Sequence, residues 1–203
     1  MICTNKDKLE AFMLHNLKEK RYRHSLGVEK MSKFLAECYG IDADKASFAG
    51  RYHDIAKGFS DEFLNRLIRE FAISDEYMNN QALAHSKVAE ALLKYEFNVE
   101  DEDVLAAVSG HTTGRKGMSL LEEIVYVSDA IEENRDYPEL KTLQNQAKTD
   151  LDGACLFIMD YTIDLVQKKG RCLDKDTIEA REYINDRISR REYERSNKNR
   201  RCY

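Results

Sequence analysis

The stretch AGRYHDIAKGF, Ala49 to Phe59, places a histidine and an aspartate side by side at His53 and Asp54, within a run that otherwise has the pattern of a buried helix. Burying a carboxylate is unfavourable unless a partner compensates its charge. Two interpretations are open at this point. Either the pair belongs to a capped or salt-bridged helix end, or it binds a metal ion. Residues elsewhere in the chain bear on that choice.

Composition favours one globular domain with a small appendage. The chain has 203 residues, and 42% of them are hydrophobic, which is enough for a real core. The net charge of −5 argues against nucleic acid as the main partner. The five cysteines show no CxxC spacing. Because we recognise neither a signal peptide nor an apolar run of membrane-spanning length, we expect a cytoplasmic protein with reduced thiols and no membrane contact.

Helical periodicity runs through almost the whole chain, which contains one proline and nine glycines. We therefore expect an all-α fold of roughly eight to ten helices. A capping box of Asp176 and Glu179 is expected to begin the last helix. Residues 1–189 are expected to form one domain, and residues 190–203 a polar, basic C-terminal tail. The other expected helices are 5–19, 24–39, 43–58, 61–71, 80–95, 101–110, 119–133 and 139–168, the last of these long or broken.

Four of the five histidines continue an apolar helix face, and two aspartates lie on or beside such a face. Each one alone fits a satisfied core residue. Together they are difficult to satisfy without a cation, because inward-facing carboxylates need one. Imidazole combined with carboxylate is a ligand set for Zn, Fe, Mn or Co and not for Ca, so the sequence predicts a transition-metal site. The candidate ligands are His24, His53, Asp54, His85, His111 and Asp129.

Basic side chains lie close in sequence to these candidates. Lys57 follows His53 by one helical turn, so its ammonium group can share the same face. Arg21 precedes His24 by three residues, but taken alone it is closer to an ordinary surface charge. We expect Lys57 to compensate phosphate charge.

A hydroxyl- and glycine-rich segment follows His111. The stretch SGHTTGRKGMS, Ser109 to Ser119, contains Thr112 and Arg115. Glycines let a backbone approach an anion, and hydroxyl and guanidinium groups donate hydrogen bonds to it. Arg135 lies just beyond the helix that carries Asp129. These residues indicate a phosphate-containing ligand.

The ordered set His24, His53–Asp54 and Asp129 resembles the H…HD…D signature of HD-domain metal-dependent phosphohydrolases. The strings RHSLGVEKM, HDIAK, AHS, GHTTGRKGMS, YVSDAIEENRD and DLDGA are similar to the bacterial YqeK family of symmetrical diadenosine tetraphosphate (Ap4A) hydrolases. The similarity extends over roughly residues 20–182. It implies the HD-domain helical bundle and iron as the metal, as one or two ions, with Mn, Co or Zn as substitutes. The substrate implied is Ap4A, cut between its second and third phosphates to give two ADP.

The resemblance also implies roles for individual residues. His24, His53, Asp54 and Asp129 match the metal-ligand motif, and His85 and His111 match two further histidines that hold a second metal or contact phosphate. Asp54 and Lys57 would serve catalysis by hydroxide that the metal generates from water. The nucleotide-contacting segment of the family falls here on CLDKDT, Cys172 to Thr177, which lacks the His-Pro pair expected in that segment. Substrate contacts are expected from Arg21, Lys57, His85, His111, Thr112, Arg115, Arg135 and the segment Cys172, Leu173, Asp174, Lys175, Asp176 and Thr177.

Other functions remain open on the sequence. The nearest is an HD nucleotidase or phosphodiesterase that acts on another nucleotide. Another is a regulator that binds a nucleotide or metal without turnover. Nucleic-acid binding through the basic tail is disfavoured, because the tail has few aromatic residues and the body is acidic. The expected partner is a small dinucleoside polyphosphate, and a homodimer is left open.

Overall fold

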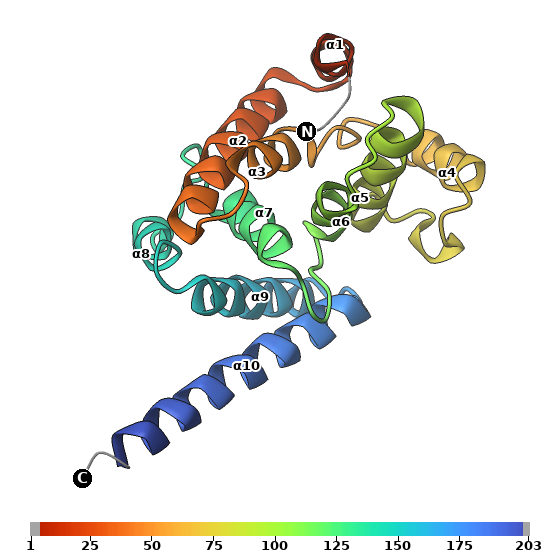
Figure 1. Cartoon of the computed structure of the whole chain (residues 1–203). Coiled ribbons are helices and arrows are strands. Elements are labelled where there is room, and N and C mark those ends of the chain that lie inside the picture. The colour runs from red at the N-terminus through yellow and green to blue at the C-terminus, as the bar shows by residue number, and fades with distance from the viewer. Residues whose placement is uncertain (1–4, 201–203) are drawn as a thin grey trace.

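The computed structural model describes residues 5–200, and within them it contains ten α-helices and no strand (Figure 1). The expected all-α fold is therefore confirmed. A short 3₁₀-helix at Asp75–Tyr77 and a π-helix at Leu92–Glu96 supplement the α-helices. The helices are α1 (Lys6–Asn16), α2 (Glu19–Tyr39), α3 (Ala43–Tyr52), α4 (Asp61–Glu70), α5 (Gln81–Ala91), α6 (Glu102–Gly110), α7 (Leu120–Ile131), α8 (Leu140–Gln146), α9 (Leu151–Lys168) and α10 (Lys175–Arg200).

Several helix ends follow local sequence signals. Ser119 and Glu122 form the capping box that begins α7. Gly40 ends α2 with a φ of 68°, a left-handed conformation that disfavours residues with a Cβ atom. The predicted capping box at the start of the last helix is wrong. Helix α10 begins at Lys175, and the backbone N–H of Asp176 donates to the Asp174 carboxylate at 2.8 Å, so the cap lies two residues earlier than expected.

Helices α2, α3, α6 and α7 pack against one another around a shared apolar core. Each contributes fully buried side chains, and burying one leucine or valine stabilises a fold by about 1.5–3 kcal/mol. Helices α2 and α3 approach closely because α3 carries Gly50, where a Cβ atom would lie only 2.9 Å from the Val28 carbonyl oxygen. This approach places His53 beside His24, with ring centroids 5.3 Å apart.

The chain leaves α3 earlier than the periodicity predicted. Helix α3 ends at Tyr52, and residues 53–58 form a series of tight turns rather than further helix. One of these turns is closed by the Lys57 N–H, which donates to the Asp54 carbonyl at 2.9 Å. A tighter backbone with three residues per turn brings side chains at i and i+3 onto one line, so Asp54 and Lys57 share a face.

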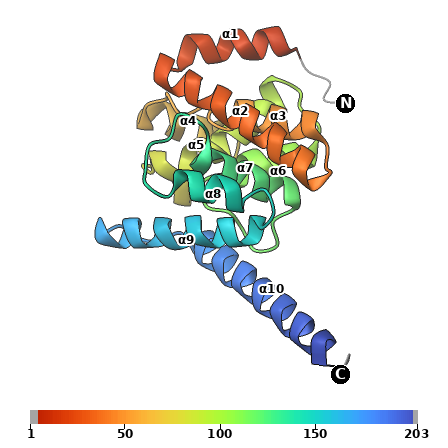
Figure 2. The ribbon, with the colours of Figure 1, turned by 90° about the vertical axis from the view of Figure 1, so that its left-hand side faces the viewer.

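Helices α9 and α10 pack against one side of this core, to which each contributes buried residues (Figures 1 and 2). Helix α9 packs on α7 and α8, and α10 crosses α9 before its C-terminal part extends away from the other helices. Arg187 of α10 contacts Glu123 of α7 and Asp152 of α9, and Arg191 also pairs with Asp152. These ion pairs fix the middle of α10 to the body of the domain.

The predicted tail, residues 190–203, is helical as far as Arg200, and residues 201–203 lie outside the described part of the chain. The division into a domain and a tail stays a prediction. Across residues 5–200, no helix combines the length and the apolar character that crossing a membrane requires.

Candidate metal centre

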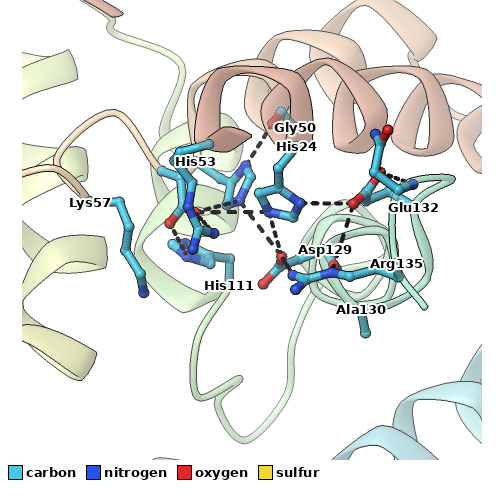
Figure 3. Close-up of polar contacts among 12 residues, drawn as sticks. His24, Gly50, His53, Lys57, His111, Asp129, Ala130, Glu132 and Arg135 are labelled. Atoms are coloured by element: carbon cyan, nitrogen blue, oxygen red, sulfur yellow. Dashed lines mark hydrogen bonds and ion pairs between the residues drawn. The ribbon is translucent and has the colours of Figure 1, made fainter. Parts of the chain in front are cut away.

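The six predicted ligands converge from five elements of the fold, and Figure 3 labels four of them, His24, His53, His111 and Asp129. His24 extends from α2 and Asp129 from α7, and His111 directly follows α6. His85 lies on α5, and His53 and Asp54 lie in the tight turn after α3. Within the described residues, there are two groups of three side chains whose ligand atoms lie within 4.8 Å of one another, and both groups include His53. The groups are His24, His53 and Asp129, and His53, Asp54 and His111.

Each of the four imidazoles has its Nδ1 atom beside an oxygen that accepts a hydrogen bond. A proton on Nδ1 leaves the lone pair on Nε2, and all four Nε2 atoms face the centre of the cluster. Three of the acceptors are main-chain carbonyls and the fourth is a carboxylate. The pairs are His53 with Gly50 at 2.7 Å, His111 with Val108 at 2.7 Å, His85 with Gln81 at 3.0 Å and His24 with Glu132 at 3.1 Å.

Asp54 lies between two pairs of histidines. Its Oδ2 atom is 3.8 Å from Nε2 of His24 and 3.5 Å from Nε2 of His53. Its Oδ1 atom is 3.2 Å from Nε2 of His85 and 3.4 Å from Nε2 of His111. The two carboxylate oxygens therefore face opposite halves of the cluster.

The donor set fits a bound cation. Nε2 of His53 is buried and lacks a hydrogen-bond partner in the described structure. Nε2 of His85 lies 3.1 Å from Nε2 of His111, which brings two lone pairs together. Nε2 of His24 faces an oxygen of Asp129 at 2.9 Å. A transition-metal ion satisfies these acceptors together, since imidazole nitrogen and carboxylate oxygen are its usual ligands.

Burial shapes the ionisation of the cluster. It lowers the pKa of His85 to about 4 and also lowers the pKa of His53, so both rings are neutral and able to bind a metal. Burial alone would raise the pKa of Asp54, but the surrounding side chains of His53, His111 and His85 hold it well below its usual range. The carboxylate is therefore an anion at neutral pH.

Three basic side chains surround the cluster. Arg21 donates to Asp54 at 2.7 Å and Arg135 donates to Asp129 at 2.6 Å. Nζ of Lys57 lies 3.1 Å from Nε2 of His85, and burial lowers the pKa of this lysine. The two arginines neutralise the carboxylates, which is the salt-bridge interpretation considered from the sequence, but they leave the imidazole lone pairs unsatisfied.

Arg115 and Thr112 take different positions. The Arg115 guanidinium donates to Glu122 of the α7 capping box at 2.5 and 2.7 Å, so the structure brings it to that helix end and not to the cluster. The Thr112 hydroxyl lies 3.2 Å from Nε2 of both His85 and His111, directly at the centre.

The segment 172–177 reaches the site through a cavity. This cavity, of about 720 Å³, is lined by Lys57 and Thr112 on one side and by Cys172, Leu173, Asp174 and Thr177 on the other. Lys175 and Asp176 do not line it. Most of the segment therefore lines the same cavity as Lys57 and Thr112, whereas none of the four cluster histidines lines this cavity.

Sequence reasoning missed Glu132, which orients His24. Its carboxyl group is buried, and one oxygen also accepts from the Asn134 N–H at 2.7 Å. Gly27 makes room for it, because a Cβ atom there would lie 2.1 Å from Oε2 of Glu132. The available signal was its position three residues after Asp129, at the residue that directly follows α7. A carboxylate that accepts from a ligand histidine fixes the ring and raises its basicity.

A helical bundle with buried imidazoles and carboxylates directed at one point defines a metal-binding helical domain. The family model described as HD domain matches residues 21–134, a stretch that contains all six predicted ligands. The chain belongs to the HD domain family, and within it to the group that includes the symmetrical bis(5'-nucleosyl)-tetraphosphatases.

That grouping rests on close relatives. The chain is 38% identical over 175 residues to the symmetrical bis(5'-nucleosyl)-tetraphosphatase of Halalkalibacterium halodurans, covering 86% of this chain and 94% of the relative. It is 37% identical over 174 residues to that of Bacillus subtilis, covering 85% and 94%. A crystal structure of a predicted HD superfamily hydrolase involved in NAD metabolism from Clostridium acetobutylicum superposes with a TM-score of 0.85 at 40% identity, covering 90% of this chain and 98% of the other. The resemblance stated from the sequence and the HD-domain fold are confirmed.

Proposed function

We propose that this protein hydrolyses diadenosine tetraphosphate between its second and third phosphates and releases two ADP. The observation that carries the proposal is the convergence of four inward-facing Nε2 atoms and two carboxylates beside three basic side chains. The names of the two tetraphosphatase relatives support the substrate. Metal ligands and cations together suit a polyphosphate, because hydrolysis of an anhydride needs both a nucleophile and charge compensation.

The ligand set supports two metal ions that share Asp54. One would bind to His24, His53, Asp54 and Asp129, and the other to Asp54, His85 and His111. We propose iron, with Mn, Co or Zn as substitutes. Such ions, when bound, lower the pKa of water toward about 7 and neutralise charge on phosphate oxygens. The opposite orientation of the two Asp54 oxygens supports this arrangement.

The chain's own side chains position the phosphates. Lys57 lies on the wall of the larger cavity and beside His85, where its ammonium group can donate to a phosphate oxygen at the centre. The Thr112 hydroxyl can donate to the same phosphate. Arg21 and Arg135 are partly exposed at the edge of the cluster, so their free N–H groups can bind the outer phosphates. Fixed donors of this kind stabilise charge that develops in the transition state.

Product identification tests the proposal. The purified protein is assayed for bound metals and is then incubated with Ap4A, other dinucleoside polyphosphates and single nucleotides, each with Fe²⁺ or Mn²⁺. We expect Ap4A to give ADP alone. Release of AMP and ATP from Ap4A would contradict the symmetrical cut. Faster turnover of a nucleoside triphosphate would favour the alternative of an HD nucleotidase, and ADP binding without any turnover would favour a regulator.

A further inference from the structure

A second cavity, of about 280 Å³, borders the metal centre between α7, α8 and α9. Its wall contains Tyr137, Phe157 and Tyr161, and none of the proposed roles uses these aromatic residues. The cavity shares only Thr112 and Thr162 with the larger cavity that is lined by the 172–177 segment. The two cavities are therefore separate spaces that meet at one pair of threonines.

Two aromatic side chains of this cavity, Phe157 and Tyr161, are not buried in the core. Tyr161 is 60% exposed and Phe157 is 41% exposed, although each is large enough to pack in a core. Both lie on α9, where they flank the cavity. Exposed aromatic rings at the rim of a concave site are typical of ligand binding, and nucleic-acid bases stack on such rings whatever their sequence.

The aromatic cavity opens directly onto the reacting region. Its inner end is formed by His111, Thr112, Asp129 and Arg135. Of the cationic residues that line it, Arg135 is the nearest in sequence to the aromatic wall, two residues before Tyr137. The larger cavity reaches the same centre through Lys57 and Thr112. A phosphate chain that crosses the centre can thus enter both cavities.

We infer that the aromatic cavity binds the nucleoside of one ADP half of the substrate, while the larger cavity binds the nucleoside of the other half. The inference rests on the proposed function. A volume of about 280 Å³ lies near the lower end of ligand pockets, which span roughly 300–1,000 Å³, and it suits one nucleoside and not a whole dinucleotide. Thr112, in the wall of both cavities and 3.2 Å from two histidines, marks where the central anhydride lies.

The inference has a chemical consequence. The two halves of the substrate are identical, yet they meet unlike surfaces. One base stacks on Tyr161 and Phe157, and the other faces the polar segment 172–177. Loss of one aromatic ring weakens binding of one half only, so it raises KM for the dinucleotide and removes one of two binding sites for free ADP.

Tyr161→Ala and Phe157→Ala test the inference, with Tyr193→Ala as the matched control because Tyr193 is 71% exposed on α10 and lines neither cavity. We expect each cavity variant to raise KM for Ap4A at least about fivefold with kcat nearly unchanged. In calorimetry, the metal-loaded wild type and the control are expected to bind two ADP per chain, and the cavity variants one. Unchanged thermal unfolding shows that the variants are folded.

The outcomes separate the two proposals. If Ap4A yields ADP but both cavity variants match Tyr193→Ala in KM and in ADP stoichiometry, the aromatic cavity is not a nucleoside site. If two ADP bind and each cavity variant loses one, but no metal supports ADP release from Ap4A, the cavity assignment stands and the proposed function fails.

Discussion

The metal centre and the α9–α10 pair are built in opposite ways. In the centre, His53 and His85 are fully buried, and each ring is fixed by a hydrogen bond from Nδ1. On α9, Phe157 and Tyr161 are exposed beside an open cavity. Chemistry requires ligands held within fractions of an ångström, whereas base stacking tolerates adjustment. If the aromatic cavity binds a nucleoside as inferred above, one small domain separates the reacting groups from a surface that selects the substrate.

Helix α7 connects the two regions. Asp129 near its C-terminal end reaches the metal centre, while Glu123 near its start contacts Arg187 of α10. Substitutions along this one helix and beside it can therefore show which region controls metal binding, catalysis or stability.

The largest effect is expected from Asp54→Ala. This carboxylate lies within 4 Å of four imidazole nitrogens, so its loss removes the anion that both halves of the cluster share. We expect loss of bound metal and a fall in turnover of about 10³-fold or more. Metal analysis and ADP release measure both quantities. Asp44→Ala, an exposed aspartate in the first turn of α3, is the control. Full metal occupancy in Asp54→Ala would exclude Asp54 as a ligand.

Lys57→Ala is expected to separate catalysis from metal binding. Its ammonium group faces His85 and the larger cavity, but it cannot ligate a metal while protonated. We expect metal content to stay at the wild-type level and kcat for Ap4A to fall about 10²-fold. Lys33→Ala on the exposed side of α2 provides the matched control. Normal turnover in Lys57→Ala would mean that the proposed role of this lysine is wrong.

Glu132→Gln is expected to weaken the centre without removing a ligand. The amide can still accept a hydrogen bond from His24, but it does not raise the basicity of the ring as a carboxylate does. We expect metal affinity to fall about 10-fold to 100-fold, measured by competition with a chelator. The neighbouring Glu133→Gln is the control, since the Glu133 side chain is 60% exposed and forms an ion pair with Lys30. Equal affinities in the two variants would rule out the orienting role.

The smallest effect on catalysis is expected from Glu123, where α7 contacts α10 through Arg187. Burial raises the pKa of Glu123 to about 7 from its ordinary value of 4.5, although Arg187 opposes the shift. The folded protein therefore binds this proton more tightly than the unfolded chain does. Stability is expected to fall as pH rises from about 4.5 to above 7, by about 1–3 kcal/mol from this group.

Urea unfolding at several pH values tests that expectation. Glu123→Gln should flatten the pH dependence in this interval and leave KM for Ap4A unchanged. A wild-type slope that persists in Glu123→Gln would assign the pH dependence to another group.

The sequence predicted the helices and all six cluster residues, because helical periodicity is a local feature and the order of His24, His53–Asp54 and Asp129 resembles a family signature. It did not predict where Arg115 lies, since the choice between a phosphate and Glu122 depends on how the segment after His111 folds back onto α7. It also missed Glu132, whose role depends on the space that Gly27 leaves between α2 and α7. Contacts between distant helices were the information that the sequence lacked.

Some expectations remain predictions. They include the identity and number of the metal ions, the cytoplasmic location, a homodimer and the division between residues 1–189 and 190–203. The first three depend on metal supply, cellular context or a second chain, and none of these is encoded in helical periodicity.

The four oxygen atoms that accept hydrogen bonds from Nδ1 of the histidines differ in how easily a mutation removes them. Those of His53, His85 and His111 are peptide carbonyls, which every amino acid carries, so substitution at Gln81 or Val108 leaves the accepting atom in place. Only His24 depends on a genetically replaceable group, the Glu132 carboxylate. Drift in sequence can therefore retune the centre at this one corner, whereas the orientation of the other three imidazoles is inherited with the backbone itself.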